Sequence, residues 1–336
     1  MEMKRSLAVL FALAALAVGV HAAFARTSHA SVQTGVVVVE TNLAYANGAA
    51  AGTGIVLTSN GEVLTNNHVI RGSTTIKAIV PQTHKTYTAR VVGYSLSADV
   101  ALLKLNGASG LATANVGSSS ALATGQSVTA VGNAGGTGSL AVTTGTITGL
   151  KRTITVSDDQ GGAVQLHGLV ETDASLQPGD SGGPLLDSAY RVIGIDTAAS
   201  AGFSFQQGGS DGYAIPINRA LAIVKQVLGG RSSSTVHIGG TAFLGVEVQP
   251  SGYYNGGSYA AGEIVTGVVP GGPAAKAGIV SGDVITRVNG RAVSSATAVV
   301  AELLTKHPGD KVAVTWVDQS TGSHSATITL ASGPPQ

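Results

Sequence analysis

Cysteine is absent from the 336 residues of this sequence. Its absence excludes disulfide bonds, a thiol nucleophile and cysteine metal sites. Aromatic residues make up only 4% of the chain, so a hydrophobic core must be built from valine, isoleucine, leucine and alanine. The histidines are scattered, no H-E-x-x-H motif occurs, and no glycine-rich phosphate loop is followed by lysine. The sequence therefore predicts no metal and no other cofactor.

Long apolar runs are confined to the N terminus. Lys4 and Arg5 precede the apolar stretch Leu7–Val20, and small residues follow it as far as Ala25. A basic start, about 14 apolar residues and a small-residue cleavage site are typical of a secretory signal peptide, and a membrane span needs about 20 residues. We therefore expect a signal peptide over residues 1–25 and an exported protein, which is secreted or held in the cell envelope or a periplasm-like space. An uncleaved anchor is the alternative.

Clusters of like charge are also missing. The formal net charge is +1 at pH 7, and loss of Glu2, Lys4 and Arg5 with the signal peptide leaves the chain formally neutral. No stretch rich in lysine or arginine follows. Nucleic acid and anionic membranes are therefore not predicted as partners.

Short apolar runs separated by turns dominate the sequence from Val36 to Ile217. One of them, Glu62–Thr65, follows an Asn60-Gly61 pair, which is a strong hairpin signal. About ten such runs, in a chain with 47 glycines, are typical of a β-sandwich or β-barrel. The long helices that alternate with strands in α/β proteins are missing.

A change of pattern near residue 230 predicts a domain boundary. The first convincing helix covers Arg219–Leu228, with Asn218 as its cap and two glycines after it. The serine-rich stretch that follows has the composition of a flexible linker. The expected units are a β domain over residues 32–230, a linker over 231–237 and a second domain over 238–332.

The second domain combines strands with two helices. Pro273–Ala277 is predicted as a short helix with proline in its first turn, and Ala296–Lys306 as a longer one. Strands are expected over Phe243–Val248 and Val284–Val288.

One serine stands among glycines in the stretch QPGDSGGPLL, residues 177–186. Glycine lets the backbone bend sharply and approach another molecule closely. Alone, the stretch fits either a polar turn or the nucleophile elbow G-x-S-x-G of α/β-hydrolases. A nucleophilic Ser181 needs a base and an orienting acid. His68 in TNNHVI and Asp99 in SADVALL, each at the end of a predicted strand, are the candidates.

The order of these residues separates two classes of hydrolase. An α/β-hydrolase places its acid and histidine after the serine. Here only His237, His307 and His324 follow Ser181, at a linker, before a proline and near a turn. The order His68, Asp99, Ser181 is that of chymotrypsin. A protease is therefore favoured over a secreted esterase.

The segments TNNHVI, ADVALLKL and TDASLQPGDSGGPLL resemble the trypsin-like proteases of the HtrA/DegP family. FLGVEV and GGPAAKAGIVSGDVITRVNG resemble the PDZ domain that follows the protease in that family. The resemblance covers roughly residues 32–332. It implies a mainly β protein, in which a chymotrypsin-like double β-barrel, with the active site in the cleft between two perpendicular six-stranded barrels, precedes a PDZ domain.

The resemblance also implies roles for single residues. Ser181 becomes the nucleophile, His68 the general base and then acid, and Asp99 the orienting carboxylate. The backbone N–H groups of Gly179 and Ser181 form the oxyanion hole. Ser175 lies at the base of the primary substrate pocket and is uncharged, which disfavours cleavage after lysine or arginine. The residues expected to line this pocket are Ser175, Leu176, Thr197 and Ala198. A place for Leu176 in the hydrophobic core, without substrate contact, is the alternative.

Two departures from the family pattern stand out. Asp180 occupies a position where the family more often has asparagine. Lys151 or Arg152 is its expected partner, and the alternative is that Asp180 biases the loop toward an inactive shape. Residues 26–34 contain no aromatic residue, whereas several relatives form trimers through an aromatic-bearing N-terminal segment. A homo-oligomer is therefore an open expectation.

In the second domain, Leu244, Gly245 and Val246 match the loop that binds the terminal carboxylate of a peptide, which then adds as an extra strand. An ordinary strand start is the alternative. The expected partners are polypeptide substrates and peptide C-termini. The leading hypothesis is a secreted serine endopeptidase (EC 3.4.21.-) for unfolded or damaged proteins. Its rival is a latent protease that acts mainly as a chaperone or peptide-binding protein.

Overall fold

The computed structural model describes residues 32–158, 163–197, 203–205, 212–250 and 261–336. The predicted signal peptide and Ala198 lie outside these residues. Within them, no helix has both the length and the apolar character needed to cross a membrane.

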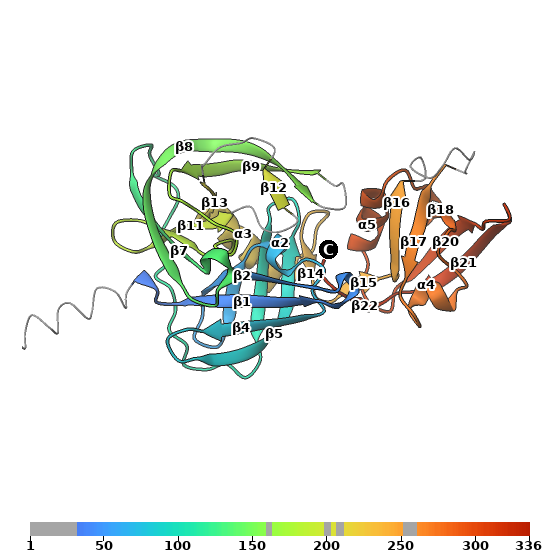
Figure 1. Cartoon of the computed structure of the whole chain (residues 1–336), viewed down its shortest axis with the longest axis horizontal. Helices are drawn as coiled ribbons and strands as arrows, with labels where there is room; N and C mark the ends of the chain where they lie inside the picture. The colour runs from blue at the N-terminus through green and yellow to red at the C-terminus, as the bar shows by residue number, and fades with distance from the viewer. Residues whose placement is uncertain (1–31, 159–162, 198–202, 206–211, 251–260) are drawn as a thin grey trace, which may run out of the picture.

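Six antiparallel strands close into the first barrel of the N-terminal domain (Figure 1). They are β1 (Val36–Leu43), β2 (Gly48–Val56), β3 (Glu62–Thr65), β4 (Thr75–Val80), β5 (Lys85–Ser95) and β6 (Val100–Leu105). Their order is β5-β4-β1-β2-β3-β6, and pairing of β5 with β6 completes the circle. Val37 and Val39 of β1 point into this barrel, while Val36 faces the other way because side chains alternate along a strand. A 3-10 turn, η1 (Ala44–Ala46), joins β1 to β2.

The second barrel is built in the same way. Its strands are β7 (Ser127–Gly132), β8 (Ala141–Asp158), β9 (Ala163–Thr172), β10 (Pro184–Leu186), β11 (Val192–Thr197), β12 (Phe203–Phe205) and β13 (Gly212–Pro216). The order is β12-β8-β7-β10-β11-β13-β9, and pairing of β8 with β9 closes six of these strands. A 3-10 turn, η2 (Ala134–Gly136), follows β7. The two six-stranded barrels confirm the predicted fold class.

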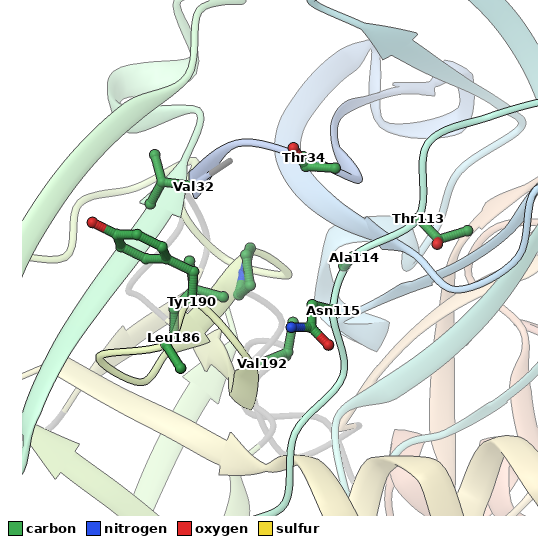
Figure 2. A pocket seen from close by; sticks show the side chains of 10 residues that line it. Val32, Thr34, Thr113, Ala114, Asn115, Leu186, Tyr190 and Val192 are labelled. Carbon is green, nitrogen blue, oxygen red and sulfur yellow. The ribbon is translucent and has the colours of Figure 1, made fainter. Parts of the chain in front are cut away.

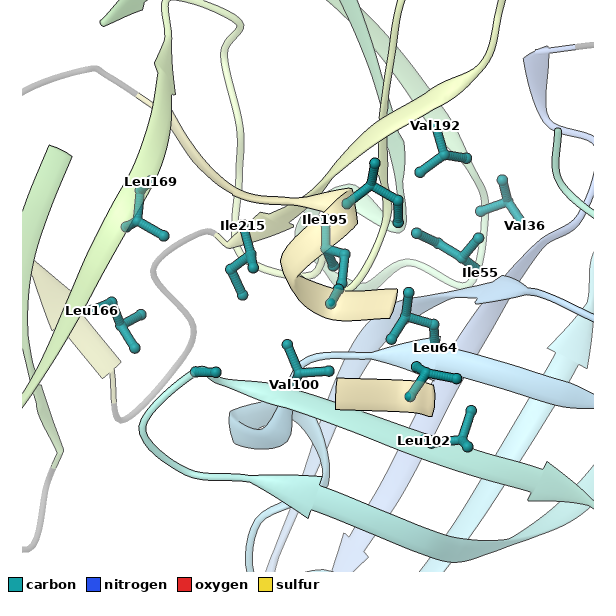
Figure 3. Close-up of a cluster of buried hydrophobic side chains, with 14 of the residues drawn as sticks. Val36, Ile55, Leu64, Val100, Leu102, Leu166, Leu169, Val192, Ile195 and Ile215 are labelled. Atoms are coloured by element: carbon teal, nitrogen blue, oxygen red, sulfur yellow. The ribbon is translucent and has the colours of Figure 1, made fainter. Parts of the chain in front are cut away.

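A shared hydrophobic cluster fixes the two barrels against each other (Figure 3). Val36 and Leu64 enter it from the first barrel, and Ile195 and Ile215 from the second. Helix α3 (Ile217–Leu228) adds Val224. Apolar burial of this kind stabilises by about 25 cal/mol per Å². Loops that meet at the seam between the barrels are therefore held on a rigid base.

The start of α3 differs from the predicted one. The helix begins at Ile217 with Pro216 as its N-cap residue, and no side chain caps it. Asn218, the predicted cap, lies inside the helix, where its amide bonds Ser118 and Ser119. The prediction was wrong because the preceding strand β13 ends at Pro216, whose fixed φ already suits a helix start.

The C-terminal domain contains a main sheet, a separate two-stranded sheet of β15 and β22, and two helices. Its strands are β15 (Thr241–Phe243), β16 (Val246–Pro250), β17 (Glu263–Val268), β18 (Val284–Val288), β19 (Arg291–Ala292), β20 (Lys311–Val317), β21 (Ser323–Thr329) and β22 (Ala331–Gly333). The order β16-β17-β18-β20-β21 leaves β16 at an edge. Helices α4 (Pro273–Lys276) and α5 (Ala296–Leu304) cover the sheet, and Ser295 caps α5 through its side chain. Val299 and Leu303 bury one face of α5 in the core with Trp316.

The stretch between the two domains is docked rather than free. Residues His237–Ile238 form β14, which pairs with β5 at the edge of the first barrel. The buried ring of His237 lies between two carbonyl oxygens, with Nδ1 3.0 Å from Leu304 and Nε2 3.0 Å from Gly240. Leu304, at the end of α5, also packs on the core of the first barrel.

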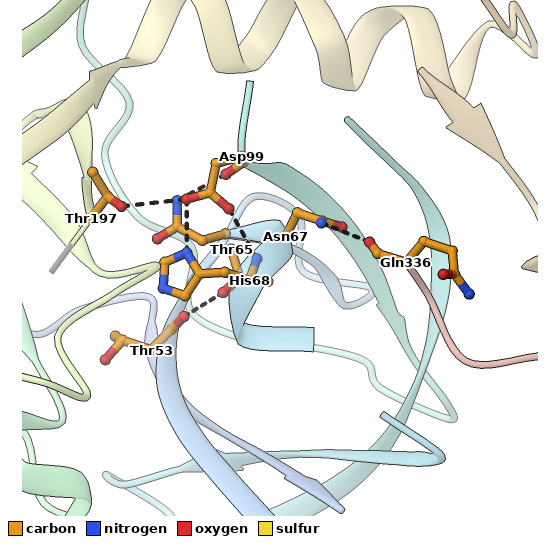
Figure 4. A network of polar contacts seen from close by, with 8 residues as sticks. Thr53, Thr65, Asn67, His68, Asp99, Thr197 and Gln336 are labelled. Carbon is orange, nitrogen blue, oxygen red and sulfur yellow. Dashed lines mark hydrogen bonds and ion pairs between the residues drawn. The ribbon is translucent and has the colours of Figure 1, made fainter. Parts of the chain in front are cut away.

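The last residues of the chain return to the first barrel. After β22, the carbonyl of Pro335 accepts a hydrogen bond from the N–H of Gly72 at 2.8 Å. The carbonyl of Gln336 accepts one from Nδ2 of Asn67 at 2.9 Å (Figure 4). This C-terminal strap, residues 334–336, therefore lies against the helix that carries His68.

Candidate active site

His68 is held by a short helix at the end of a strand. β3 ends at Thr65, and α2 (Asn67–Ile70) begins after an extended Asn66. Val69 and Ile70 are buried in the core of the first barrel, so the helix is anchored by its apolar face. The imidazole of His68 is 2% exposed. The strand end and the anchored turn together fix the direction of the ring.

Asp99 meets His68 through both oxygens of its carboxylate (Figure 4). Oδ2 lies 2.8 Å from Nδ1 of His68, and Oδ1 accepts the backbone N–H of His68 at 2.9 Å. The hydroxyl of Thr197 donates to Oδ2 at 3.3 Å. An ionised carboxylate only accepts hydrogen bonds, so Nδ1 carries the ring proton of a neutral His68 and Nε2 keeps the lone pair.

A left-handed backbone places Asp99 at this point. Its φ is +53°, which is uncommon for residues other than glycine, although aspartate tolerates it better than most. The amide of Asn66 donates to the carbonyl of Asp99 at 2.9 Å and so supports the turn. The residue is 4% exposed, which shields its pairing with His68 from solvent.

The Ser181 loop needs glycines at two positions. Gly179 and Gly182 have φ values of +100° and +87°. A Cβ atom at Gly182 would overlap the carbonyl oxygen of Thr53 and the hydroxyl of Thr65. A Cβ atom at Gly179 would overlap the carbonyl oxygen of Asn133. The sequence QPGDSGGPLL therefore forms a loop that presses closely on its neighbours, rather than an isolated polar turn.

Strand β2 ties this loop to the side of the molecule that carries His68. The N–H of Thr53 donates to the carbonyl of Ser181 at 2.8 Å, and its hydroxyl donates to the carbonyl of Gly179 at 2.8 Å. Thr65, three residues before His68, donates to the carbonyl of Thr53 at 2.7 Å. Strand β2 therefore brings the loop of Ser181 next to the end of β3.

Gly52 marks the closest approach of the two segments. A Cβ atom at this position would lie 2.7 Å from a methyl group of Val69 and 3.1 Å from the carbonyl oxygen of Ser181. The helix of His68 and the loop of Ser181 thus face one another across a single glycine.

The peptide between Pro178 and Gly179 has a defined orientation. The N–H of Gly135 donates to the carbonyl of Pro178 at 2.7 Å. Because the C=O and N–H of a trans peptide point in opposite directions, the N–H of Gly179 is directed away from η2. The loop can therefore offer this N–H to a ligand beside Ser181.

Comparisons with known proteins agree with this arrangement. The trypsin-like peptidase domain family matches residues 52–195, and the PDZ domain family matches residues 264–318. The serine protease PepD of Mycobacterium tuberculosis is 34% identical over 314 residues, which are 90% of this chain and 64% of PepD. The periplasmic pH-dependent serine endoprotease DegQ of Escherichia coli is 34% identical over 276 residues, 78% of this chain and 55% of DegQ.

A solved structure shares the architecture of both domains. It is the HtrA-type protease AlgW with a tripeptide, which is 27% identical, with a TM-score of 0.51. The match covers 92% of this chain and 98% of AlgW. The chain belongs to the HtrA/DegP family of trypsin-like serine proteases. It spans less than two thirds of the length of PepD and DegQ.

Asp180, the aspartate that departs from the HtrA/DegP pattern, has no cation beside it among the described residues. Oδ2 of Asp180 accepts the N–H of Gln177 at 2.9 Å, and Oδ1 has no hydrogen-bond partner within the described chain. The expected pairing with Arg152 was wrong, because Arg152 binds Glu171 at 2.9 Å. Lys151 also forms no ion pair with Asp180 among the residues described. Burial raises the pKa of Asp180 above its ordinary value.

A second buried aspartate, Asp196, lies next to the loop of Ser181. Asp196 in β11 is fully buried, and neither carboxylate oxygen has a partner in the described part of the chain. Burial raises the pKa of Asp196 well above its ordinary value, and the charge of Asp180 raises it further. Asp196 is not among the residues that the sequence predicts for the site. The available signal was an acidic residue inside the otherwise apolar run of β11.

The residues expected around the substrate pocket occupy different environments. Ser175 is exposed, and Leu176 is half-buried against Gly212 and the core of the second barrel. Thr197 is buried and directs its hydroxyl to Asp99. The pocket shown in Figure 2 is a separate one between the start of the described chain and the turn after β10, and it contains none of these residues.

The expected carboxylate loop of the PDZ domain connects β15 to β16, so the single strand predicted over Phe243–Val248 is divided in two. Gly245 has a φ of +81° and breaks the strand. The carbonyls of Leu244 and Gly245 accept hydrogen bonds from Ala274 and Val269, each at 3.0 Å. The side chain of Leu244 is buried in the core, so only its backbone can meet a ligand.

Metal ligands do not cluster in the part of the chain that the structure describes. No three histidine, aspartate or glutamate side chains there lie close enough together to hold a metal ion.

Proposed function

We propose that this chain is a serine endopeptidase that hydrolyses peptide bonds of unfolded or damaged proteins. The observation that carries the proposal is the paired His68 and Asp99, at 2.8 Å, facing the glycine-bounded loop of Ser181 across β2. Family membership supports the same reaction. The likeness to DegQ, a periplasmic protein by name, supports export, in line with the predicted signal peptide.

The proposed reaction begins with attack of the Ser181 hydroxyl oxygen on the carbonyl carbon of the substrate. Nε2 of His68 takes the hydroxyl proton, and Asp99 stabilises the imidazolium through Nδ1–H. The N–H groups of Gly179 and Ser181 stabilise the oxyanion, a contribution of about 3–4 kcal/mol per donor in such sites. His68 then protonates the leaving amine, and water hydrolyses the acyl-enzyme by the reverse sequence.

The environment of the proposed pocket favours apolar substrates. Ser175 carries no charge, and Leu176 offers an apolar wall. Cleavage is therefore proposed after small or medium apolar residues such as valine, alanine or leucine. The proposed PDZ domain binds extended peptide C-termini along the edge strand β16.

A latent protease that acts as a chaperone or peptide-binding protein is the second candidate. The observation that favours it is the absence of a cation at Asp180 within the described residues. In that case the loop would be intact but inactive at the working pH.

Substitution Ser181→Ala tests the first candidate. We expect it to remove labelling by a fluorophosphonate probe and to lower casein hydrolysis by at least about a thousandfold, because the nucleophile is lost. Ser118→Ala, which changes an exposed serine of the same domain, is the matched control and should keep both activities. Peptidase activity that survives in Ser181→Ala would place the nucleophile elsewhere, and absence of activity in the unchanged chain would favour latency.

A further inference from the structure

Two buried carboxyl groups lie under the proposed nucleophile loop without a cation among the described residues. Asp180 is 4% exposed and Asp196 is 0% exposed. Asp180 has one hydrogen bond, from the N–H of Gln177, and the carboxyl group of Asp196 has none in the described chain. The charge of Asp180 adds to the effect of burial in raising the pKa of Asp196.

The backbones of the same two segments are bonded to each other. The N–H of Gly182 donates to the carbonyl of Asp196 at 2.9 Å, and the N–H of Asp196 donates to the carbonyl of Gly183 at 2.8 Å. These bonds flank Ser181 on its C-terminal side. A force between the two carboxyl groups therefore acts on the segment that holds the proposed nucleophile and oxyanion donors.

Where the structure describes them, the elements around the pair bring no compensating charge. β2, β7 and β10 carry no titratable side chain in the positions that pack here. Tyr213 of β13 donates its hydroxyl to Glu171. On the neighbouring side of β11, Thr197 contacts Asp99, which is paired with His68. Two ionised carboxylates in such a site would repel each other without relief from an ion pair.

We propose that Asp180 and Asp196 share a proton, and that Asp196 is a positioning residue that holds Gly179 and Ser181 in place while that proton is bound. The proposal rests on the proposed peptidase function for its catalytic consequence. A proton retained by the pair leaves only one of the two groups charged and so removes the repulsion, as in other interacting carboxyl pairs. The raised pKa values of both groups agree with a proton that is retained above the ordinary range of aspartate.

The direction of the pH effect follows from the raised pKa values of Asp180 and Asp196. As the pH rises through the raised pKa of the pair, the proton leaves and both groups become charged. Repulsion then strains the bonds from β11 to Gly182 and Gly183. Activity should therefore fall on the alkaline side, separately from the acid side, where His68 must stay neutral to act as a base.

The pH profile of kcat/KM for Asp196→Asn is the first test. The unchanged chain should lose activity at alkaline pH. Asp196→Asn should abolish that loss or shift its midpoint upward by at least about one pH unit, because repulsion between two carboxylates can no longer develop. The acid side of the profile should stay in place. Asp180→Asn removes the other carboxylate of the pair and should have the same effect on the alkaline midpoint. It replaces Asp196→Asn as the test if that variant fails to fold.

The matched control is Asp187→Asn. Asp187 is also buried near β10, but it is paired with Arg191 at 2.8 Å. Its loss should lower the melting temperature without moving the alkaline midpoint. An alkaline midpoint that is unchanged in both Asp196→Asn and Asp180→Asn would overturn the proposal.

An NMR titration separates this inference from the peptidase function, since it needs no turnover. In the full-length Ser181→Ala protein, the carboxyl signals of Asp180 and Asp196 should report a bound proton at neutral pH. The amide signals of Gly179 and Gly182 should move with the same midpoint. Two fully ionised carboxyl groups at pH 7, or amide signals that ignore the titration, would reject the proposal even in an active protease.

Discussion

Asp99 shows how much of a candidate site depends on neighbours that do no chemistry themselves. Its carboxylate accepts two hydrogen bonds from His68 and one from Thr197, and its carbonyl accepts one from Asn66. A buried carboxylate that loses one such donor is left partly unsatisfied, at a cost of about 1–3 kcal/mol. Thr197 is therefore expected to affect the reaction without touching the substrate.

Thr197→Val tests this role of the threonine hydroxyl. We expect kcat to fall about tenfold, equivalent to about 1.4 kcal/mol, with little change in KM, because the orientation of His68 is affected and substrate contacts are kept. Thr197→Ser retains the hydroxyl and should keep most of the activity. Equal losses in Val and Ser variants would show that the methyl group, rather than the hydroxyl, matters.

The residues that sequence order predicts are those with an intrinsic chemistry. His68, Asp99 and Ser181 stand in an order that few other functions require, so the sequence alone predicts them as a candidate triad. The hydroxyl bond of Thr197 and the isolation of Asp196 could not be predicted. Both depend on which strands become neighbours, and a single sequence does not contain that information.

Elements bounded by turn residues agree best with prediction. Glu62–Thr65, between an Asn-Gly turn and α2, and Val284–Val288, before another Asn-Gly turn, match β3 and β18. The sequence predicts only short strands in the first domain, whereas β8 extends from Ala141 to Asp158. Polar residues from Lys151 onward interrupt the apolar pattern, so the sequence does not predict a strand over the second half of β8. Pairing with β9, a tertiary contact, keeps that half extended.

The edge strand β16 carries a prediction at the scale of one element. Full-length Ser181→Ala protein should bind an apolar-ended peptide with a free carboxylate at least about tenfold more tightly than its amidated form, because a charge-assisted hydrogen bond is lost on amidation. Isothermal titration calorimetry measures both affinities, and a peptide of scrambled sequence is the control. Equal affinities for the two peptides would show that the loop at Gly245 does not bind a terminal carboxylate and only connects β15 to β16.

Over the whole molecule, two groups of acidic residues make the stability depend on pH in opposite directions. Burial raises the pKa of Asp180, Asp196 and Glu263. The stability that these acids contribute is complete below their unfolded pKa and is lost as the pH rises through the folded pKa. Hydrogen bonds lower the pKa of Asp318. At Asp187, burial raises the pKa, but hydrogen bonds from Arg191 and Ala189 lower it by more. The stability that Asp318 and Asp187 contribute is therefore lost as the pH falls.

Melting temperature against pH should therefore reveal the buried pair. The unchanged chain is expected to melt at a lower temperature at pH 8 than at pH 5, and Asp196→Asn should narrow that difference by at least about 2 °C, the shift expected for a change near 1 kcal/mol. Differential scanning calorimetry at both pH values gives the comparison. A difference that stays the same in Asp196→Asn would mean that other groups cause it.

The C-terminal strap and the absence of cysteine together make domain docking directly observable. Gln336 contacts the first barrel through its backbone, with its carbonyl on Asn67 and its N–H 3.4 Å from the hydroxyl of Tyr94. Its side chain can therefore be replaced while these bonds remain. Gln336→Cys would introduce a single thiol into a cysteine-free chain, at a residue that contacts the first residue of the helix of His68. A fluorescent label on this thiol would report separation of the C-terminal domain from the helix of His68. An affinity tag attached at residue 336 would lie next to the same helix.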